Sequence, residues 1–316
     1  MGRMMQGIEI CRSYWENVGL PSFKDIFSDG LNEIAIGMVG PGSECFFFDD
    51  EISRDHDWGP GFCIWMNNLN DHELRRNLES WYDSLPKNYL DINERISVDV
   101  DAQRVGVDGV REFYQRYTGL SHIPKDYHEW YGIPSSSLAT CTNGQVFHDS
   151  SGTFTDWRTA LLAFYPEEVR RHKIARLCLS ASQSGQYNLL RSIKRKDVYT
   201  TRYCLMKFLA DCISIVYLIN KKYEPFYKWA YRGVSYLKIL GKEVSFLIER
   251  ILDIPLFTPS SQKFEDYVFT ELHKGIDEMG EAISRELMRQ NMVDVVDAYL
   301  WISGEQIMKN AKLGSE

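Results

Sequence analysis

The sequence lacks the short motifs that identify several common enzyme classes. It contains no GxSxG turn, no HExxH pair, no GxxxxGK loop and no GxGxxG loop. These absences argue against serine hydrolases, zinc proteases, P-loop kinases and Rossmann dehydrogenases. No CxxC pair occurs among the seven cysteines, several of which lie in apolar runs such as FCIWM. We therefore expect reduced, mostly buried thiols and no zinc site.

Long apolar segments are also missing. The most apolar run, CLMKFLADCISIVYLI, contains Lys207 and Asp211 and is too short to span a bilayer, so it predicts a core helix. The first residues, MGRMMQGIEI, have no apolar stretch of the kind found in signal peptides. These features predict a cytoplasmic protein without a membrane partner. The formal net charge of -8 disfavours a broad nucleic-acid surface, although it leaves room for a local basic cleft.

The chain is long enough for two domains, with 316 residues of which 44% are hydrophobic. Up to about residue 155, strand and helix signals alternate, whereas beyond it strand signals nearly vanish and helical periodicity continues. We therefore predict an α/β domain, residues 1–155, followed by an all-α helical-bundle domain, residues 156–316. The predicted helical segments of the second domain are 166–195, 198–222, 224–240, 242–253, 264–289 and 291–312.

Turn and cap residues mark the elements of the first part. Gly19 and Pro21 predict the end of a helix that starts at residue 5, and Asn70 or Asp71 can cap a helix that runs to residue 84. Gly119 is expected to end a helix over REFYQRYT. The remaining predictions are strands at 34–39, at 58–66, in RVGVDGV and in TNGQVFHDSSG, and an irregular loop over 121–137.

Residues 34–66 form the most informative stretch, IAIGMVGPGSECFFFDDEISRDHDWGPGFCIWM. An apolar strand is followed by Gly42-Ser43, a spacer, and Asp55-His56-Asp57, which runs into a second apolar strand. Because side chains of a strand alternate between its faces, Asp55 and Asp57 are expected on the same face. Two carboxylates beside a Gly-Ser turn are suited to hold a divalent metal ion and a nucleoside triphosphate together.

Nucleotidyl transfer would use this combination of residues. Mg²⁺ prefers carboxylates and substrate phosphates, and two ions can activate an acceptor hydroxyl and support the departing pyrophosphate. Asp55 and Asp57 are the candidate metal ligands, while Gly42 and Ser43 can present N–H groups and a hydroxyl to the phosphates, particularly where Ser43 opens a short helix. The alternative is that Asp55 and Asp57 are solvated loop acids in the acidic segment that begins at Asp49.

The segment VGPGSECFFFDDEISRDHDW resembles the signature of the DNA polymerase beta-like nucleotidyltransferase superfamily. Gly42-Ser43 and Asp55-x-Asp57 match it, whereas His56 departs from it, since the superfamily usually has an apolar residue there. The whole chain resembles a bacterial family of that superfamily catalogued as a domain of unknown function, on the further motifs TNGQVFHDSSGTF, SQSGQYNLLRSIKRKD and LINKKYEPFYKWAYR. The resemblance implies a nucleotidyltransferase domain with a mixed sheet and flanking helices, followed by a helical domain like those of antibiotic nucleotidyltransferases.

The resemblance also implies a third carboxylate on a later strand, and three residues are candidates. Asp99 and Asp101 share a face of ISVDVD, whereas Asp108 lies in RVGVDGV, a predicted strand that leads directly into a helix. We favour Asp108 because of that context. Each of the three can instead be an exposed strand acid.

Two polar clusters of the helical half are candidates for a basic wall beside the cleft. In SQSGQYNLLRSIKRKD, the residues Gln183, Tyr187, Arg191 and Arg195 fall on one stripe at helical spacing. In KKYEPFYKWAYR, Lys228 is a candidate to reach the triphosphate. A polar network between helices is the alternative interpretation of both clusters.

We therefore expect a nucleotidyltransferase that uses Mg²⁺, as two ions, to move a nucleoside monophosphate from an NTP such as ATP to a hydroxyl of a small molecule. Two alternatives remain open: a toxin- or antitoxin-like transferase that acts on RNA or protein, and a catalytically inactive nucleotide-binding module. The sequence does not predict the oligomeric state. The predicted catalytic residues are Asp55, Asp57 and Asp108, and the predicted nucleotide-binding residues are Gly42, Ser43 and Lys228.

Overall fold

The computed structural model describes residues 5–27, 30–55, 57–96, 104–256 and 262–310, so His56, Asp99 and Asp101 lie outside the described residues. Contacts divide the chain into two compact units, Met1–Lys125 with Ile133–Ala163, and Asp126–Gly132 with Phe164–Glu316. The first holds a sheet with flanking helices, and the second contains only helices in its described residues. This confirms the predicted fold class. The boundary predicted after residue 155 falls inside helix α7 (Thr153–Leu162), which belongs to the first unit.

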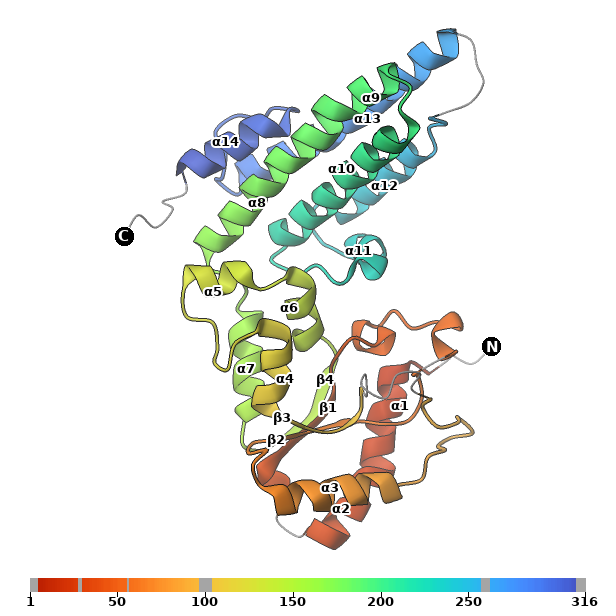
Figure 1. Ribbon diagram of the computed structural model, residues 1–316, viewed down its shortest axis with the longest axis vertical. Helices are drawn as coiled ribbons and strands as arrows, with labels where there is room; N and C mark the ends of the chain where they lie inside the picture. The colour runs from red at the N-terminus through yellow and green to blue at the C-terminus, as the bar shows by residue number, and fades with distance from the viewer. Residues whose placement is uncertain (1–4, 28–29, 56, 97–103, 257–261, 311–316) are drawn as a thin grey trace. The chain divides into compact units, whose positions relative to one another are not determined.

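The sheet of the first unit has four strands in the order β3-β2-β1-β4 (Figure 1). Strand β1 (Ile34–Met38) pairs antiparallel with both β2 (Cys63–Met66) and β4 (Gln145–Asp149), whereas β3 (Gly106–Gly109) pairs parallel with β2. The sheet is therefore mixed. The strands predicted in RVGVDGV and TNGQVFHDSSG are confirmed.

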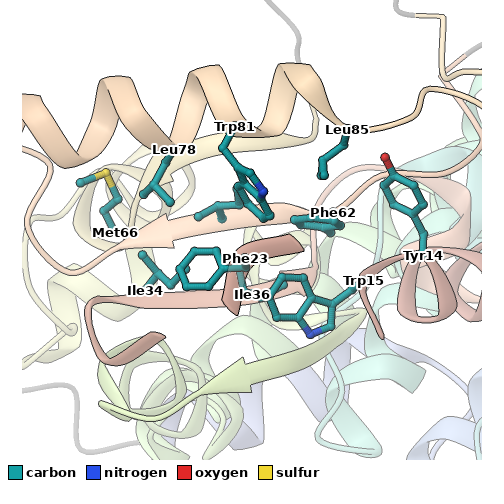
Figure 2. Close-up of a cluster of buried hydrophobic side chains, with 11 residues drawn as sticks. Tyr14, Trp15, Phe23, Ile34, Ile36, Phe62, Met66, Leu78, Trp81 and Leu85 are labelled. Carbon is teal, nitrogen blue, oxygen red and sulfur yellow. The ribbon is translucent and has the colours of Figure 1, made fainter. Parts of the chain in front are cut away.

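One face of the sheet carries a large aromatic core (Figure 2). Helices α1 (Gly7–Tyr14), α2 (Leu20–Phe27) and α3 (His72–Ser84) and the π-helical turn η1 (Trp15–Gly19) bring their apolar side chains to it. Burial of one such side chain contributes about 1.5–3 kcal/mol. The helix predicted to end at residue 84 is confirmed, and Asp71 caps it by accepting the Leu74 N–H at 3.0 Å. The buried members are Tyr14, Trp15, Phe23, Ile34, Ile36, Phe62, Ile64, Met66, Leu78, Trp81 and Leu85.

The first helix does not end at Gly19 and Pro21, and that prediction is wrong. The chain continues through η1 into α2, and the Leu20 N–H donates to the Trp15 carbonyl in the wider π-helical pattern. Proline removes a donor and clashes with the preceding turn of an ordinary helix, but a π turn has already changed the hydrogen-bond pattern there. Gly19 also permits close packing, because a Cβ at this position would lie 2.9 Å from the Phe62 ring.

The opposite face of the sheet packs on α4 (Val110–Thr118) and α7, with α6 (Ser135–Thr142) against them. Trp65 of β2 stacks on Phe154 with ring centroids 4.1 Å apart. Gly119 ends α4 in the left-handed conformation, as predicted. The irregular loop predicted over 121–137 is wrong, because α5 (Tyr127–Gly132) and the start of α6 lie there. Helices this short carry too few turns to give a periodic apolar signal.

The second unit is a set of helices around the long central helix α10 (Val198–Ile219). The predicted segment 291–312 is only partly helical, since α14 begins at Leu300. Within the described parts of the chain, no helix is long and apolar enough to cross a membrane. All seven cysteines of the chain are buried and unbridged, as expected. The other helices of this unit are α5, α8 (Glu167–Ala181), the π-helical segment η6 (Ser182–Leu189), α9 (Leu190–Lys194), α11 (Tyr227–Val234), α12 (Gly241–Leu252), α13 (Gln262–Arg289) and α14 (Leu300–Asn310).

Candidate functional site

The turn after β1 is held in place by the segment that precedes β4. Gly40 has a φ of 149°, a backbone conformation that favours glycine. Its N–H donates to Asn143 Oδ1 at 3.0 Å, and its carbonyl accepts from Asn143 Nδ2 at 2.7 Å. Arg158 in turn donates to the Asn143 carbonyl at 2.6 Å. Asn143 therefore fixes the start of the Gly-Ser turn across the sheet.

Ser43 opens the short 3₁₀ helix η3 (Ser43–Phe46), which matches the expectation for a Gly-Ser turn. Gly42 precedes it with an ordinary φ of -65°, so positive φ is not the reason for a glycine here. A Cβ at Gly42 would lie 2.6 Å from the carboxyl carbon of Glu44. Gly42 thus makes room for the buried Glu44 carboxylate, which is only 1% exposed.

Asp55 and Asp57 do not lie on a strand, so the predicted same-face alternation is wrong. Asp55 follows the 3₁₀ turn η4 (Ile52–Arg54) with helical dihedrals and is exposed. Asp57 has a φ of 47° and is 6% exposed. Strand β2 begins only at Cys63, because Gly59 and Gly61 take positive φ values that are incompatible with a regular strand. The segment reaches the site as a loop, and the metal-binding role of the two acids stays a prediction.

Arg95 joins the Gly-Ser turn to Asp57. Its Nη1 lies 2.8 Å from Glu44 Oε1 and 3.5 Å from Asp57 Oδ1, and it donates to the Asp57 carbonyl at 2.7 Å. Its Nη2 donates to the Gly59 carbonyl at 3.0 Å. Burial alone would lower the pKa of Arg95, but the Glu44 and Asp57 carboxylates outweigh burial and raise that pKa. The guanidinium is therefore a fixed positive charge between the two halves of the site.

A second arginine completes the charge balance around Asp57. Arg104, two residues before the start of β3, forms an ion pair with Asp57 Oδ2, while Arg95 faces Oδ1. The Arg104 carbonyl accepts the Cys63 thiol at 3.0 Å, which ties this arginine to the start of β2. Both oxygens of Asp57 thus face guanidinium groups.

Three buried polar atoms close to this network have no hydrogen-bond partner among the described residues: Glu44 Oε2, Asp49 Oδ1 and Arg95 Nε. The other oxygen of Asp49 accepts the Gly7 N–H at 2.8 Å and the Trp58 indole N–H at 3.3 Å. An unpaired buried polar group costs about 1–3 kcal/mol. Such atoms mark the cluster as a place where a bound group can supply missing partners.

Asp108 lies on β3 opposite Trp65, and β3 leads directly into α4, as predicted. Its Oδ2 accepts from Arg116 Nη2 at 2.7 Å and its Oδ1 accepts the Gly109 N–H at 2.8 Å. Burial raises the pKa of the Cys63 thiol to about 12, and the Asp108 charge adds to that shift. In the strand register, Asp108 lies two residues beyond Gly106, which pairs with Cys63 at the start of β2.

Lys228, on α11 of the second unit, is exposed, and its ammonium lies 5.0 Å from the centre of the Trp229 ring. Its predicted role toward a nucleotide remains a prediction. The stripe of Gln183, Tyr187 and Arg191 lies on and beside η6, whose π-helical turns change the expected periodicity. Arg191 still donates to the Tyr187 hydroxyl at 3.0 Å.

The residues that sequence reasoning missed are Glu44, Arg95, Arg104 and Asn143. Glu44 carries one usable signal, because it is a charged residue placed directly before the apolar run CFFF. Asn143 lies in a noted motif but has no local feature that relates it to Gly40. Arg95 and Arg104 flank a segment outside the described residues, and only the fold brings them to Asp57.

The donor set does not by itself form a metal site. Among the described residues, no group of three or more His, Cys, Asp or Glu side chains is placed to hold a metal ion. Asp57 is paired with two arginines, so a divalent ion bound there has to compete with guanidinium groups. Glu44 Oε2 and Asp49 Oδ1 are buried carboxylate oxygens in or beside the Arg95 network that have no hydrogen-bond partner among the described residues.

Comparisons with known proteins give one family match and one distant structural similarity. A family model described as a domain of unknown function (DUF4037) matches residues 130–230, about a third of the chain. No curated protein matches the chain significantly. Among solved structures, the chain is similar to a nucleotidyltransferase-like protein from Exiguobacterium sibiricum 255-15, with 8% identity, a TM-score of 0.37, and coverage of 85% of this chain and 79% of that chain.

Proposed function

We propose that the protein is a nucleotidyltransferase, which moves a nucleoside monophosphate from an NTP to a hydroxyl of a small molecule and releases pyrophosphate. The observation that supports it is the shared contact of Arg95 Nη1 with Glu44 and Asp57. That contact brings the two halves of the sequence signature together at one end of β1 and β2, within the segment that connects these two strands. The Gly-Ser turn and an acid of the Asp-x-Asp segment are then neighbours, as nucleotidyl transfer requires.

Each predicted residue has a role in this proposal. Ser43, at the start of η3, and Gly42 would contact the phosphates. Asp55 and Asp57 would hold Mg²⁺ ions that arrive with the NTP, with Asp57 exchanging its Arg104 partner for the metal. Bound Mg²⁺ would supply charge stabilisation at the transferred phosphoryl group. Asp108 would be the third acid.

Lys228 would add a point charge to the triphosphate from the helical unit. A charge-assisted contact is worth about 1.5–3 kcal/mol, so Lys228→Met should weaken NTP binding by roughly tenfold or more. Methionine keeps the unbranched stem and removes only the ammonium. Equal NTP affinities of the variant and the wild type would remove Lys228 from the site.

A nucleotide-binding module without catalysis is the second candidate, and a specific observation favours it. Both oxygens of Asp57 face arginines, and the described residues contain no cluster of three possible metal ligands. Such a module would bind NTP through the Gly-Ser turn and the arginines without needing Mg²⁺. The two candidates differ in the metal dependence of binding and in turnover.

The test is incubation with each labelled NTP and Mg²⁺, with a panel of small-molecule, RNA and protein acceptors, followed by measurement of released pyrophosphate. Asp57→Asn is expected to lower turnover at least about a hundredfold, since several kcal/mol of transition-state stabilisation depend on the bound metal. Asp108→Asn tests the third acid at a half-buried position. Asp83→Asn, an exposed acid of α3, is the matched control and should behave as wild type.

The outcomes separate the candidates. Pyrophosphate release that depends on Mg²⁺ and Asp57 supports the transferase. Metal-independent NTP binding without turnover on any acceptor supports the inactive module. Loss of the two Asp57 ion pairs can also destabilise the fold. The folded fraction of Asp57→Asn is therefore measured by circular dichroism, and turnover is compared with the wild type per folded protein. Absence of NTP binding by calorimetry with and without Mg²⁺ contradicts both.

A further inference from the structure

The turn between α9 and α10 carries a strongly basic surface, which we call the α9–α10 surface and define as the exposed side chains from Tyr187 to Tyr203. The only acidic residue in this stretch, Asp197, is engaged as the N-cap of α10. Its carboxylate accepts the Thr200 N–H at 3.0 Å and the Thr200 hydroxyl at 2.7 Å. The stretch itself is therefore positively charged, in a chain of net charge -8. The exposed basic residues are Arg191, Lys194, Arg195, Lys196 and Arg202.

Exposed tyrosines lie among these charges. Tyr187 is 52% exposed, Tyr199 79% and Tyr203 58%. Tyr199 and Tyr203 are one turn apart on α10, and their ring planes differ by only 13° with centroids 6.4 Å apart. The Arg191 guanidinium lies 4.9 Å from the centre of the Tyr187 ring and also donates to its hydroxyl. Flat aromatic faces are thus presented to solvent beside arginines.

The base of this surface is well packed. The Thr201 hydroxyl donates to the Asp197 carbonyl at 2.7 Å and lies 2.9 Å from Ser192 Oγ, and both Ser192 and Thr201 are buried. Gly185 of η6 allows close approach of Phe208 on α10, since a Cβ there would lie 2.9 Å from the Phe208 Cβ. The exposed rings and guanidinium groups therefore project from a fixed helix pair, which lowers the entropy lost on binding a ligand.

We propose that the α9–α10 surface binds single-stranded nucleic acid. Aromatic side chains stack on bases and basic side chains neutralise phosphates, and this surface offers both on one pair of helices. A single strand is favoured over a duplex because only unpaired bases expose their flat faces to tyrosine rings. RNA and DNA share this chemistry, so the test includes both. The proposal needs no nucleotidyl transfer, because it concerns the helical unit and involves no NTP.

The experiment uses the full chain and fluorescently labelled oligo-U and oligo-dT, with binding followed by anisotropy at about 50 and about 200 mM salt. We expect binding at the lower salt that weakens at the higher salt. The double variant Tyr199→Ala/Tyr203→Ala should weaken binding roughly tenfold or more, since each lost stack removes a contact between ring and base. Arg195→Ala/Arg202→Ala should lower the slope of log K against log salt by about 0.7 for each phosphate contact removed.

The matched control is Tyr236→Ala/Lys238→Ala, which removes an exposed tyrosine and an exposed lysine elsewhere in the same unit. All of these side chains are exposed, so unchanged melting curves are expected and show that each variant is folded. Retained affinity in the Tyr199/Tyr203 variant overturns the proposal, as does an equal loss in the control. Absence of binding to both oligonucleotides at the lower salt also overturns it. Vesicles containing anionic lipid are a further arm, and tyrosine-dependent binding to them in place of the oligonucleotides would assign the surface to a membrane instead.

Discussion

Two buried arginines, one in each unit, are held in different ways. Arg170 of α8 uses its Nε and both Nη atoms, which donate to Glu167, to the Leu218 carbonyl and to Gln290. Arg95 of the α/β unit is buried to the same degree, but it lies between loops. Its Nε has no hydrogen-bond partner among the described residues.

The difference separates an arginine that supports the fold from one that belongs to a candidate site. Each side-chain nitrogen of Arg170 has a hydrogen-bond acceptor, as expected for a buried charge with a purely structural role. The Arg95 network contains unpartnered atoms on Arg95 and Glu44, each of which costs free energy in the folded protein. Incomplete pairing of this kind is typical of positions that gain partners when a ligand binds.

The largest effect is expected from Arg95→Met. The variant leaves Glu44, 1% exposed, and Asp57, 6% exposed, without this cation. Breaking a buried ion pair by removing one partner costs about 3–5 kcal/mol in the free energy of unfolding. Urea unfolding followed by circular dichroism measures the loss. The control Arg75→Met, which removes an exposed arginine paired with Glu79, should cost under about 1 kcal/mol. Equal unfolding curves for the two variants would show that Arg95 is not a structural link.

Arg170→Met should have a smaller effect, about 2–3 kcal/mol. Its partner Glu167 is 46% exposed and can be solvated when the guanidinium is lost, unlike Glu44. The Leu218 carbonyl and Gln290 still lose a donor. The same urea unfolding experiment compares the two arginine variants. A loss for Arg170→Met larger than that for Arg95→Met would reverse the comparison.

Gly42→Val should cost about 2 kcal/mol, because the new side chain meets the Glu44 carboxylate and disturbs its pairing with Arg95. Ser43→Ala removes only a hydroxyl at a half-buried position and should be close to neutral in stability. Both variants are also titrated with NTP by calorimetry. If the turn binds phosphates, Gly42→Val weakens NTP binding more than Ser43→Ala does. If both variants bind NTP with the affinity of the wild type, the Gly-Ser turn has a structural role only.

Glu224 of the helical unit should give the smallest effect, and it depends on pH. Burial raises the pKa of this carboxyl from 4.5 to about 6, and Asp211 adds to the shift. Between these two values the folded state keeps a proton that the unfolded chain has lost, so stability falls as pH rises through this window. Glu224→Gln removes the cost. It should be more stable than the wild type by up to about 2 kcal/mol at pH 8 and no more stable at pH 4. If the variant and the wild type differ in stability by the same amount at pH 8 and at pH 4, the raised pKa of Glu224 is contradicted.

The elements that could be predicted from the sequence are those with local causes. Strand β1 is a short apolar run before a glycine turn, α3 has its cap at Asp71, and α4 ends at Gly119. The continuation of the first helix past Pro21 could not be predicted, because it depends on a π turn that packs against Phe62. Local propensity does not report such a tertiary contact.

The candidate site likewise has features with local causes, which could be predicted, and features that depend on tertiary contacts, which could not. The Gly-Ser turn and the Asp-x-Asp segment are local patterns, and the sequence indicates both. The burial of Asp57 could not be predicted, because the expected cleft acid is instead enclosed by Arg95 and Arg104. Glu44 and Arg95 are 51 residues apart, and nothing in their neighbourhoods relates them before the chain folds.

The burial of all seven cysteines makes the chain well suited to site-specific labelling. Burial raises the pKa of Cys11, Cys63 and Cys141 to about 12, so these thiols stay protonated and are poor nucleophiles at neutral pH. Thiol-reactive dyes should therefore leave the native chain nearly unmodified. Cysteines introduced at the exposed positions Asp83 and Tyr236, one in each unit, would carry a dye pair without removal of any native cysteine. Energy transfer between the dyes would then report the distance between the units before and after NTP is added.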